Sequence, residues 1–159
     1  MYAAPSPSAK RCHSGAAGLP PGSPDLGLLL NPANPSHHPV EARGRNAGID
    51  RRAFASGWSS DSLVRCTDCH GGDGPEDAGV HGSSWAGLLK RRHLAAPGFQ
   101  SATREDLCFA CHAWEAYVEP SSATRFGAHA SHATAGAGCW SCHDSHGSPT
   151  LPALLALRS

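Results

Sequence analysis

Three copies of one short cysteine–histidine motif constrain this chain more than any other feature. The motifs read Cys66-Thr-Asp-Cys69-His70, Cys108-Phe-Ala-Cys111-His112 and Cys139-Trp-Ser-Cys142-His143. In a helical turn, two cysteines three residues apart lie on one face, and the next histidine lies one step further round that face. This is the geometry of c-type haem attachment, in which two thioethers hold the porphyrin and the histidine ligates the iron. The sequence therefore predicts covalently bound haem c.

Paired cysteines also occur in zinc ribbons and in redox dithiols, which are the alternatives to haem attachment. Neither alternative requires a histidine directly after the second cysteine. Histidine makes up only 11 of the 159 residues, so three such histidines in three pairs would rarely arise by chance. The spacing therefore favours haem over zinc.

The composition leaves little material for an ordinary apolar core. The chain has 18 glycines and 13 prolines, is only 40% hydrophobic, and carries four Trp, two Tyr and four Phe. Porphyrins are large apolar plates around which loops can pack without much regular structure. We therefore predict a mostly irregular fold with a few short α-helices and almost no sheet, organised around stacked haems.

A fourth attachment position is predicted at Cys12 and His13. The stretch Ala9-Lys-Arg-Cys12-His13 has alanine where the first cysteine should stand. A free thiol beside an unrelated histidine is the alternative. The internal repeat favours a haem held by one thioether, because attachment motif, histidine pair, attachment motif and His-Gly-Ser recur in that order over about 9–83 and 108–148. We therefore expect four haems, three of them on complete motifs.

This repeat predicts one tetrahaem domain over residues 9–150. An exposed arm, 1–8, precedes it, and an apolar tail, 151–159, follows it. Within the domain, a capping box at 103–106 predicts a helix that continues to Tyr117, and Ser84 is placed to cap a helix over 85–94.

Two sets of side chains are predicted to hold the haems on the proximal side. The covalent attachment residues are Cys12, Cys66, Cys69, Cys108, Cys111, Cys139 and Cys142, and the proximal iron ligands are His13, His70, His112 and His143.

Distal ligands are expected to be histidines as well. The only methionine is Met1 at the chain end, which nearly excludes a Met/His haem, while seven histidines lie outside the attachment motifs. His81 and His146 share a His-Gly-Ser context, and His93 follows a basic run that favours a surface position. The predicted distal ligands are His38, His81, His132 and His146, with His37, His129 and His93 as alternatives.

Beyond the attachment motifs, longer stretches resemble the multihaem c-type cytochromes of the doubled CXXCH type. They are Asn34-Pro-Ser-His37-His38-Pro-Val40, Leu107-Cys108-Phe-Ala-Cys111-His112 and Cys142-His143-Asp-Ser-His146-Gly-Ser148. The resemblance spans about residues 9 to 150 and departs from the family pattern at Ala9. It implies electron transfer, and some small tetrahaem relatives polymerise into extracellular filaments. On this resemblance we expect closely stacked bis-histidine haems in copies joined end to end.

Other functions and partners are weighed against this expectation. A formal net charge of zero gives no indication of nucleic acid, and no apolar run is long enough to span a membrane. We expect redox donors, redox acceptors and other copies of the chain as partners. The alternatives are a soluble periplasmic electron shuttle and a haem-containing reductase subunit, but six-coordinate iron has no position for a substrate, so we expect no enzyme. The acidic loop 71–77 is expected to be a plain turn rather than a calcium site.

Covalent haem attachment normally takes place outside the cytoplasm, so an extracellular or periplasmic location is expected. The first residues do not form a signal peptide with an apolar core, which we interpret as removal or omission of that segment.

Overall fold

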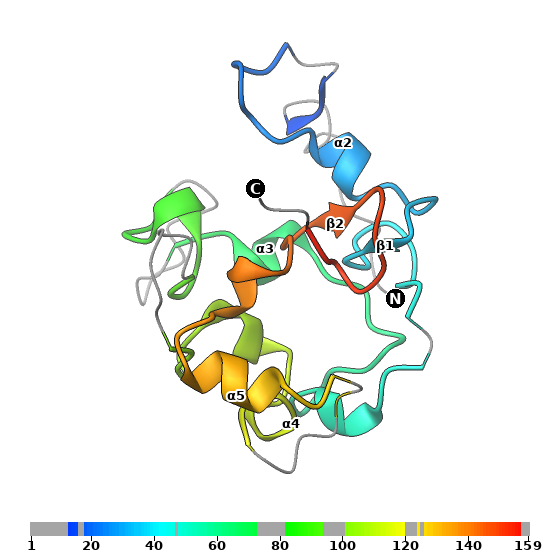
Figure 1. The fold of residues 1–159 in the computed structure, drawn as a ribbon. Coiled ribbons are helices and arrows are strands. Elements are labelled where there is room, and N and C mark those ends of the chain that lie inside the picture. The colour runs from blue at the N-terminus through cyan, green and yellow to red at the C-terminus, as the bar shows by residue number, and fades with distance from the viewer. Residues whose placement is uncertain are drawn as a thin grey trace. The chain divides into compact units, whose positions relative to one another are not determined.

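Short helical turns and irregular connections make up most of the structure, a computed structural model that describes residues 13–15, 18–46, 48–72, 82–93, 101–119, 124 and 126–156 (Figure 1). Its α-helices include α2 (Leu26–Leu29), α3 (Cys66–Cys69), α4 (Trp114–Val118) and α5 (His129–Thr134), and its 3-10 helices include η2 (Arg51–Ala53), η3 (Ala86–Leu88), η4 (Leu107–Ala110) and η5 (Cys139–Ser141). The strands are β1 (Ser36–His37) and β2 (Gly147–Ser148). The predicted fold class, mostly irregular with a few short helices and almost no sheet, is confirmed for these residues, whereas the stacking of haems stays a prediction.

Contacts divide the chain into two units. Described residues within 1–47, 61–65 and 143–159 form the first unit, and those within 48–60 and 66–142 form the second. The predicted arm, most of the acidic loop, Cys12 and His81 lie outside the described residues. The predicted domain boundaries remain predictions. None of the helices in the described part is long and apolar enough to cross a membrane.

The first unit is centred on the antiparallel pair of β1 and β2, which lie side by side in Figure 1. Ser36 faces Ser148 and His37 faces Gly147 across the pair. A Cβ atom on Gly147 would lie 1.9 Å from the carbonyl oxygen of Leu29, so any side chain here would collide with backbone. The neighbouring protein backbone therefore requires glycine at this position.

The described part of the apolar tail folds back onto the first unit. The hydroxyl of Ser36 donates to the carbonyl oxygen of Leu151 at 2.7 Å and accepts from the amide of Leu154 at 2.8 Å. The amide of Asp144 donates to the carbonyl oxygen of Leu154 at 2.7 Å. Residues 151–154 are therefore held by hydrogen bonds within their own unit.

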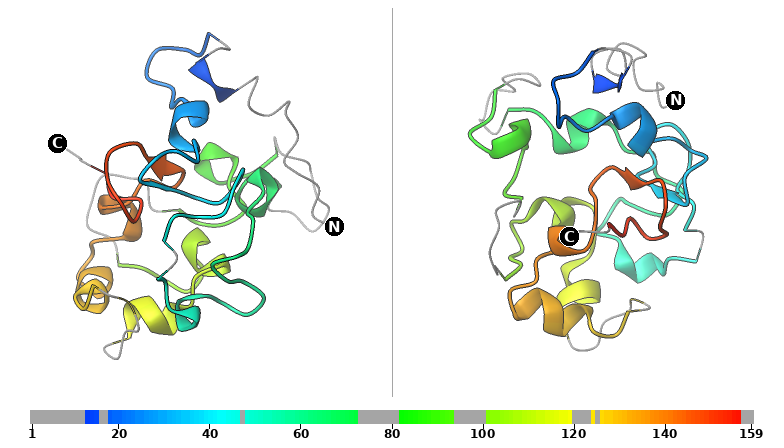
Figure 2. Two further views of the ribbon diagram at one scale, coloured as in Figure 1. Left: turned by 90° about the vertical axis from the view of Figure 1, so that its right-hand side faces the viewer. Right: turned by 45° about the horizontal axis from the view of Figure 1, so that its top comes forward.

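The second unit has a thin apolar core. Helix α4 packs against α5 and against η2, and Figure 2 shows α4 and α5 side by side in two further views. The buried hydrophobic side chains of this unit are Ala53, Leu107, Ala116, Val118 and Ala133. Three of these five are alanines, and across the described residues no large side chain is fully buried. The small core agrees with a protein whose apolar interior would be completed by a bound group.

The helix predicted from the capping box to Tyr117 is wrong, because the chain forms two separate turns, η4 and α4. Ala113, between them, is extended, with φ −75° and ψ 120°. Its amide donates to the carbonyl oxygen of Ala53 at 3.0 Å, and the carbonyl oxygen of Cys111 accepts from the amide of Ala55 at 2.9 Å. These backbone groups pair with the segment after η2 instead of continuing a helix, although α4 does end before Pro120.

The helix predicted over 85–94 is also wrong for its described residues. Only the three-residue turn η3 forms there. Gly87 has a φ of 73° and the following Leu88 a φ of 56°, both of which are incompatible with a right-handed helix. Trp85 and Leu89 instead form an antiparallel bridge around this turn.

Candidate functional site

Each complete attachment motif begins a helical turn, as its spacing predicts. The amide of His70 donates to the carbonyl oxygen of Cys66 at 2.8 Å, and the amide of His112 donates to that of Cys108 at 2.9 Å. In the third motif the turn η5 starts at Cys139. In the first two motifs the histidine amide closes the turn on the first cysteine, which is the local backbone form that the motif spacing predicts.

The six described cysteines are thiols outside any disulfide. Burial raises the pKa of Cys69 to about 11 and that of Cys111 to about 12. Both thiols are therefore neutral near pH 7, so neither is a thiolate of the kind that redox dithiols use. Among the described residues, no group of three or more His, Cys, Asp and Glu side chains is placed to hold a metal ion.

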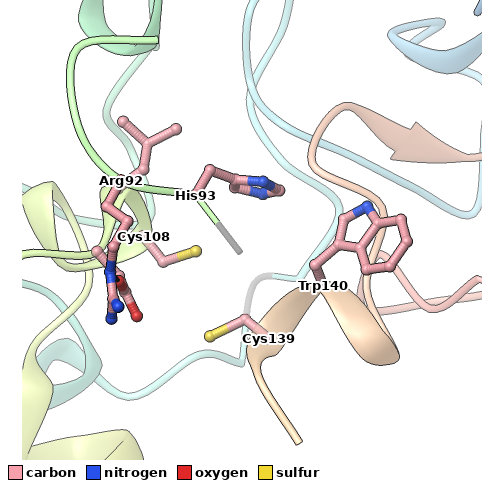
Figure 3. A pocket seen from close by; sticks show the side chains of 7 residues that line it. Arg92, His93, Cys108, Cys139 and Trp140 are labelled. Atoms are coloured by element: carbon pink, nitrogen blue, oxygen red, sulfur yellow. Dashed lines mark hydrogen bonds and ion pairs between the residues drawn. The ribbon is translucent and has the colours of Figure 1, made fainter. Parts of the chain in front are cut away.

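The first cysteines of the second and third motifs lie next to each other. The thiol of Cys108 donates a hydrogen bond to the sulfur of Cys139, which raises the pKa of Cys108. Figure 3 shows both sulfur atoms facing the space that His93 and Trp140 also line. His93, expected at the surface, is half-buried beside these two attachment cysteines. Groups attached to the two cysteines would therefore be neighbours.

The proximal histidines share one arrangement of their rings. The Nδ1 atom of His70 lies 2.9 Å from the carbonyl oxygen of Gly87, and that of His143 lies 2.9 Å from the carbonyl oxygen of Ala153. A carbonyl only accepts hydrogen bonds, so Nδ1 carries the proton and Nε2 is the nitrogen with a lone pair. Burial also lowers the pKa of His143, which favours the neutral form that binds metal.

The ring of His112 has a hydroxyl as its partner, which can donate as well as accept. Its Nδ1 atom lies 3.2 Å from the hydroxyl oxygen of Tyr117. The ring of Phe54 stacks on the imidazole at a centroid distance of 5.8 Å and an interplanar angle of 21°. Burial raises the pKa of Tyr117 to about 12, so the phenol is neutral at physiological pH. The motif spacing gave no indication of Tyr117, because its role depends on the α4 turn.

A cavity of about 350 Å³ adjoins His112. Phe54, Phe109 and Trp114 contribute rings to its lining, and Arg104 and Glu115 contribute a charged edge, where their ion pair measures 2.6 Å. The cavity thus places aromatic rings beside a predicted axial histidine.

His38 and its neighbour His37, both in the first unit, are the two candidates for one distal iron ligand. His38, the predicted ligand, has its Nδ1 atom 2.5 Å from the carbonyl oxygen of Ser145, and its amide donates to the carbonyl oxygen of His146 at 2.8 Å. His37, the alternative, is 5% exposed and has its Nδ1 atom 3.0 Å from the carbonyl oxygen of His38. The Nε2 atom of His37 is the only buried side-chain nitrogen or oxygen among the described residues with no hydrogen-bond partner.

The remaining predicted ligands differ in their burial and in their contacts. His129 and His132 both lie on α5, and Phe126 contacts both rings. The Nδ1 atom of His129 lies 2.7 Å from the hydroxyl oxygen of Thr124, a contact that the sequence did not indicate. His146 directly precedes β2 and is half-buried. His13 is exposed. Its neighbour Cys12 and the ligand candidate His81 lie outside the described residues, so the fourth haem stays a prediction.

The histidine geometry and the orphaned Nε2 atom fit haem iron as the missing partner. Engaging Nδ1 with an oxygen fixes the ring and directs the Nε2 lone pair to a metal, which is the usual arrangement at metal-bound histidines. A buried nitrogen without a partner costs about 1–3 kcal/mol, and a metal bond formed on loading would remove that cost. Haem c, whose porphyrin is held by thioether links and whose iron takes imidazole ligands, is the group that these cysteines and histidines suit.

Comparison with known proteins gives one match. Residues 62–117, which contain the first two complete motifs, match the model of a family described as the doubled CXXCH motif. No curated protein and no solved structure matches the chain. The paired CXXCH motifs and the geometry of their histidines support a multihaem c-type cytochrome with covalently bound haem c, acting in electron transfer.

Proposed function

We propose that the protein carries electrons through closely spaced haems whose irons are each held by two histidines. The observation that carries this proposal is the placement of Cys108 and Cys139 around one pocket, since thioether links on neighbouring cysteines would hold two porphyrin edges close together. Haem iron accepts and releases one electron without bond making. The chain's own contribution is to fix the spacing of the haems and the basicity of the ligands.

The proposed ligand set follows from the motifs and from the placement of the other histidines. Proximal ligation is assigned to His13, His70, His112 and His143. Distal ligation is assigned to His81, His146, one of the two α5 histidines and one of the pair at 37 and 38. The buried and unpartnered Nε2 atom of His37 supports it over His38, since ligation would supply its missing partner.

Circular dichroism in the Soret region tests the close spacing of the haems. Two porphyrins in contact couple their transitions and give a band with lobes of both signs, while separated porphyrins give a simple sum. We expect a two-signed band in the loaded protein and its loss in a variant with Cys139→Ala and Cys142→Ala. A single-signed band unaffected by that variant would contradict the proposal.

The proposal extends to assembly of copies end to end in the extracellular space. Trp85 and Leu88 are 41% and 37% exposed and flank Gly87, whose carbonyl oxygen accepts from His70. An exposed apolar turn beside a proximal histidine supports contact with another copy near that haem. Such a contact joins two different surfaces and therefore propagates into a filament.

The described part of the tail, 151–154, gives less support to assembly because its backbone is already bonded within its own unit. Electron microscopy of concentrated native protein tests the extension. Filaments are expected. Dispersed particles of monomer size would contradict assembly and leave a diffusible electron shuttle outside the cytoplasm.

A further inference from the structure

The proximal histidines differ in the acceptor that holds their Nδ1 atoms. At His70 and His143 the acceptor is a backbone carbonyl oxygen at 2.9 Å. At His112, where binding of iron through Nε2 would leave the proton on Nδ1, the acceptor is the phenol oxygen of Tyr117 at the longer distance of 3.2 Å. This contact is one difference between the histidines of the three complete motifs through which the protein can distinguish their haems.

Acceptor strength controls how much electron density an imidazole gives to iron. A peptide carbonyl oxygen is a strong acceptor, whereas the lone pair of a phenol oxygen is partly delocalised into its ring. The Nδ1–H bond of His112 is therefore less polarised than those of His70 and His143. A less electron-rich imidazole stabilises oxidised iron less, and second-shell hydrogen bonding is one of the means by which proteins set the potential of haem iron.

Ring contacts and a buried helix hold Tyr117 beside His112. Its ring lies edge-on to His112, with a centroid distance of 5.4 Å and an interplanar angle of 84°. It also lies edge-on to His129 at 5.4 Å. Its neighbours Ala116 and Val118 on α4 are both buried, at 4% and 7% exposure, so the helix is fixed against the core.

Building on the proposed function, we infer that Tyr117 sets the haem bound at Cys108 and Cys111 to the highest potential of the three complete motifs. Of these three haems it is then the first to be reduced when electrons enter. One electron from an external donor converts ferric to ferrous iron, the Nδ1 proton stays on His112, and no bond breaks. Tyr117 is a positioning residue, since it acts through the histidine and does not touch the iron.

Spectroelectrochemical titration of the loaded protein and its Tyr117→Phe variant tests the inference. Phenylalanine keeps the ring contacts and removes only the acceptor. Among the steps of the three haems on complete motifs, we expect the highest to move further upward by about tenfold in its equilibrium constant, which is about 59 mV for one electron. The other steps should stay in place. An unchanged highest step, or equal shifts in all steps, would overturn the inference.

Two further variants complete the experiment. Cys108→Ala with Cys111→Ala removes the haem in question, and the highest step should then be missing, while loss of a lower step instead would overturn the assignment. Ser101→Ala removes an exposed hydroxyl that donates to the carbonyl oxygen of Thr134 in the same unit and contacts no predicted ligand. A shift of the same step and size in this control would indicate general loosening and overturn a specific role for Tyr117. Haem content is measured separately, so preparations without haem would contradict the proposed function itself.

Discussion

Replacing Asp106 with alanine should destabilise the second unit far more than the loss of an exposed carboxylate would. Asp106 is 5% exposed and directly precedes η4, the turn that carries Cys108. Its carboxylate accepts from Arg92 Nε at 2.7 Å, from the amide of Thr103 at 2.9 Å and from the Thr103 hydroxyl at 3.3 Å. The substitution would leave a largely buried guanidinium and an amide without their acceptor.

The size of the effect follows from burial. Removing one partner of a buried ion pair costs about 3–5 kcal/mol. The Arg92 side chain is 30% exposed and keeps its hydrogen bond to the Thr103 hydroxyl at 2.7 Å. Water therefore recovers part of the loss, and we expect a decrease of about 2–3 kcal/mol in the free energy of unfolding.

Guanidinium chloride unfolding of the oxidised, loaded protein measures this decrease, with Asp61→Ala as the matched control. Asp61 also pairs with an arginine, at 2.9 Å from Arg43, but the two side chains are 67% and 73% exposed. Such a surface pair contributes about 0–1 kcal/mol. Equal losses in the two variants would refute the argument that burial decides the contribution of the Asp106 pair.

Three further outcomes are expected. Gly147→Ala should disrupt the β1–β2 pair and lower the melting temperature by several degrees, because the new Cβ would lie 1.9 Å from a backbone oxygen. In the control Gly127→Ala the new Cβ would have no atom within 4 Å, so the melting temperature should hardly change. Equal effects of the two substitutions would contradict the role of the Gly147 contact. Desolvation by burial lowers the folded-state pKa of His38 and His143 below the ordinary 6.5, so the unfolded chain binds more protons than the folded protein. The free energy of unfolding should therefore be highest above about pH 6.5 and fall as the pH drops below it. Denaturant midpoints that do not change from pH 7.5 to 5 would contradict this. The intact mass of the loaded protein should exceed that of the polypeptide by four haems. A mass showing three haems, with Cys12 free to be alkylated, would show that the prediction of a fourth haem is wrong.

Much of the local structure at the attachment motifs could be predicted from the sequence, because it depends on short-range geometry. Two cysteines three residues apart followed by histidine need only one helical turn, and α3, η4 and η5 supply it. The scarcity of apolar residues likewise indicated the irregular fold. Both features depend on composition and near-neighbour spacing, which a sequence displays directly.

The contacts that orient the histidines could not be predicted, because they come from distant backbone. The carbonyl oxygen of Ala153 reaches the ring of His143 only after the tail has folded back. The role of Tyr117 requires the chain to leave the helix at Ala113, where hydrogen bonds to a segment 60 residues earlier outweigh local helix propensity. Tertiary pairing of this kind overrides a capping-box signal.

The central claim is that the chain binds several haems covalently, and optical spectroscopy combined with mass spectrometry of the purified protein tests it most directly. The account predicts an intense Soret band and a haem mass that stays on the polypeptide after acid denaturation, since thioether bonds survive the loss of axial ligands. A colourless protein at the bare polypeptide mass, purified from cells able to mature c-type cytochromes, would contradict it.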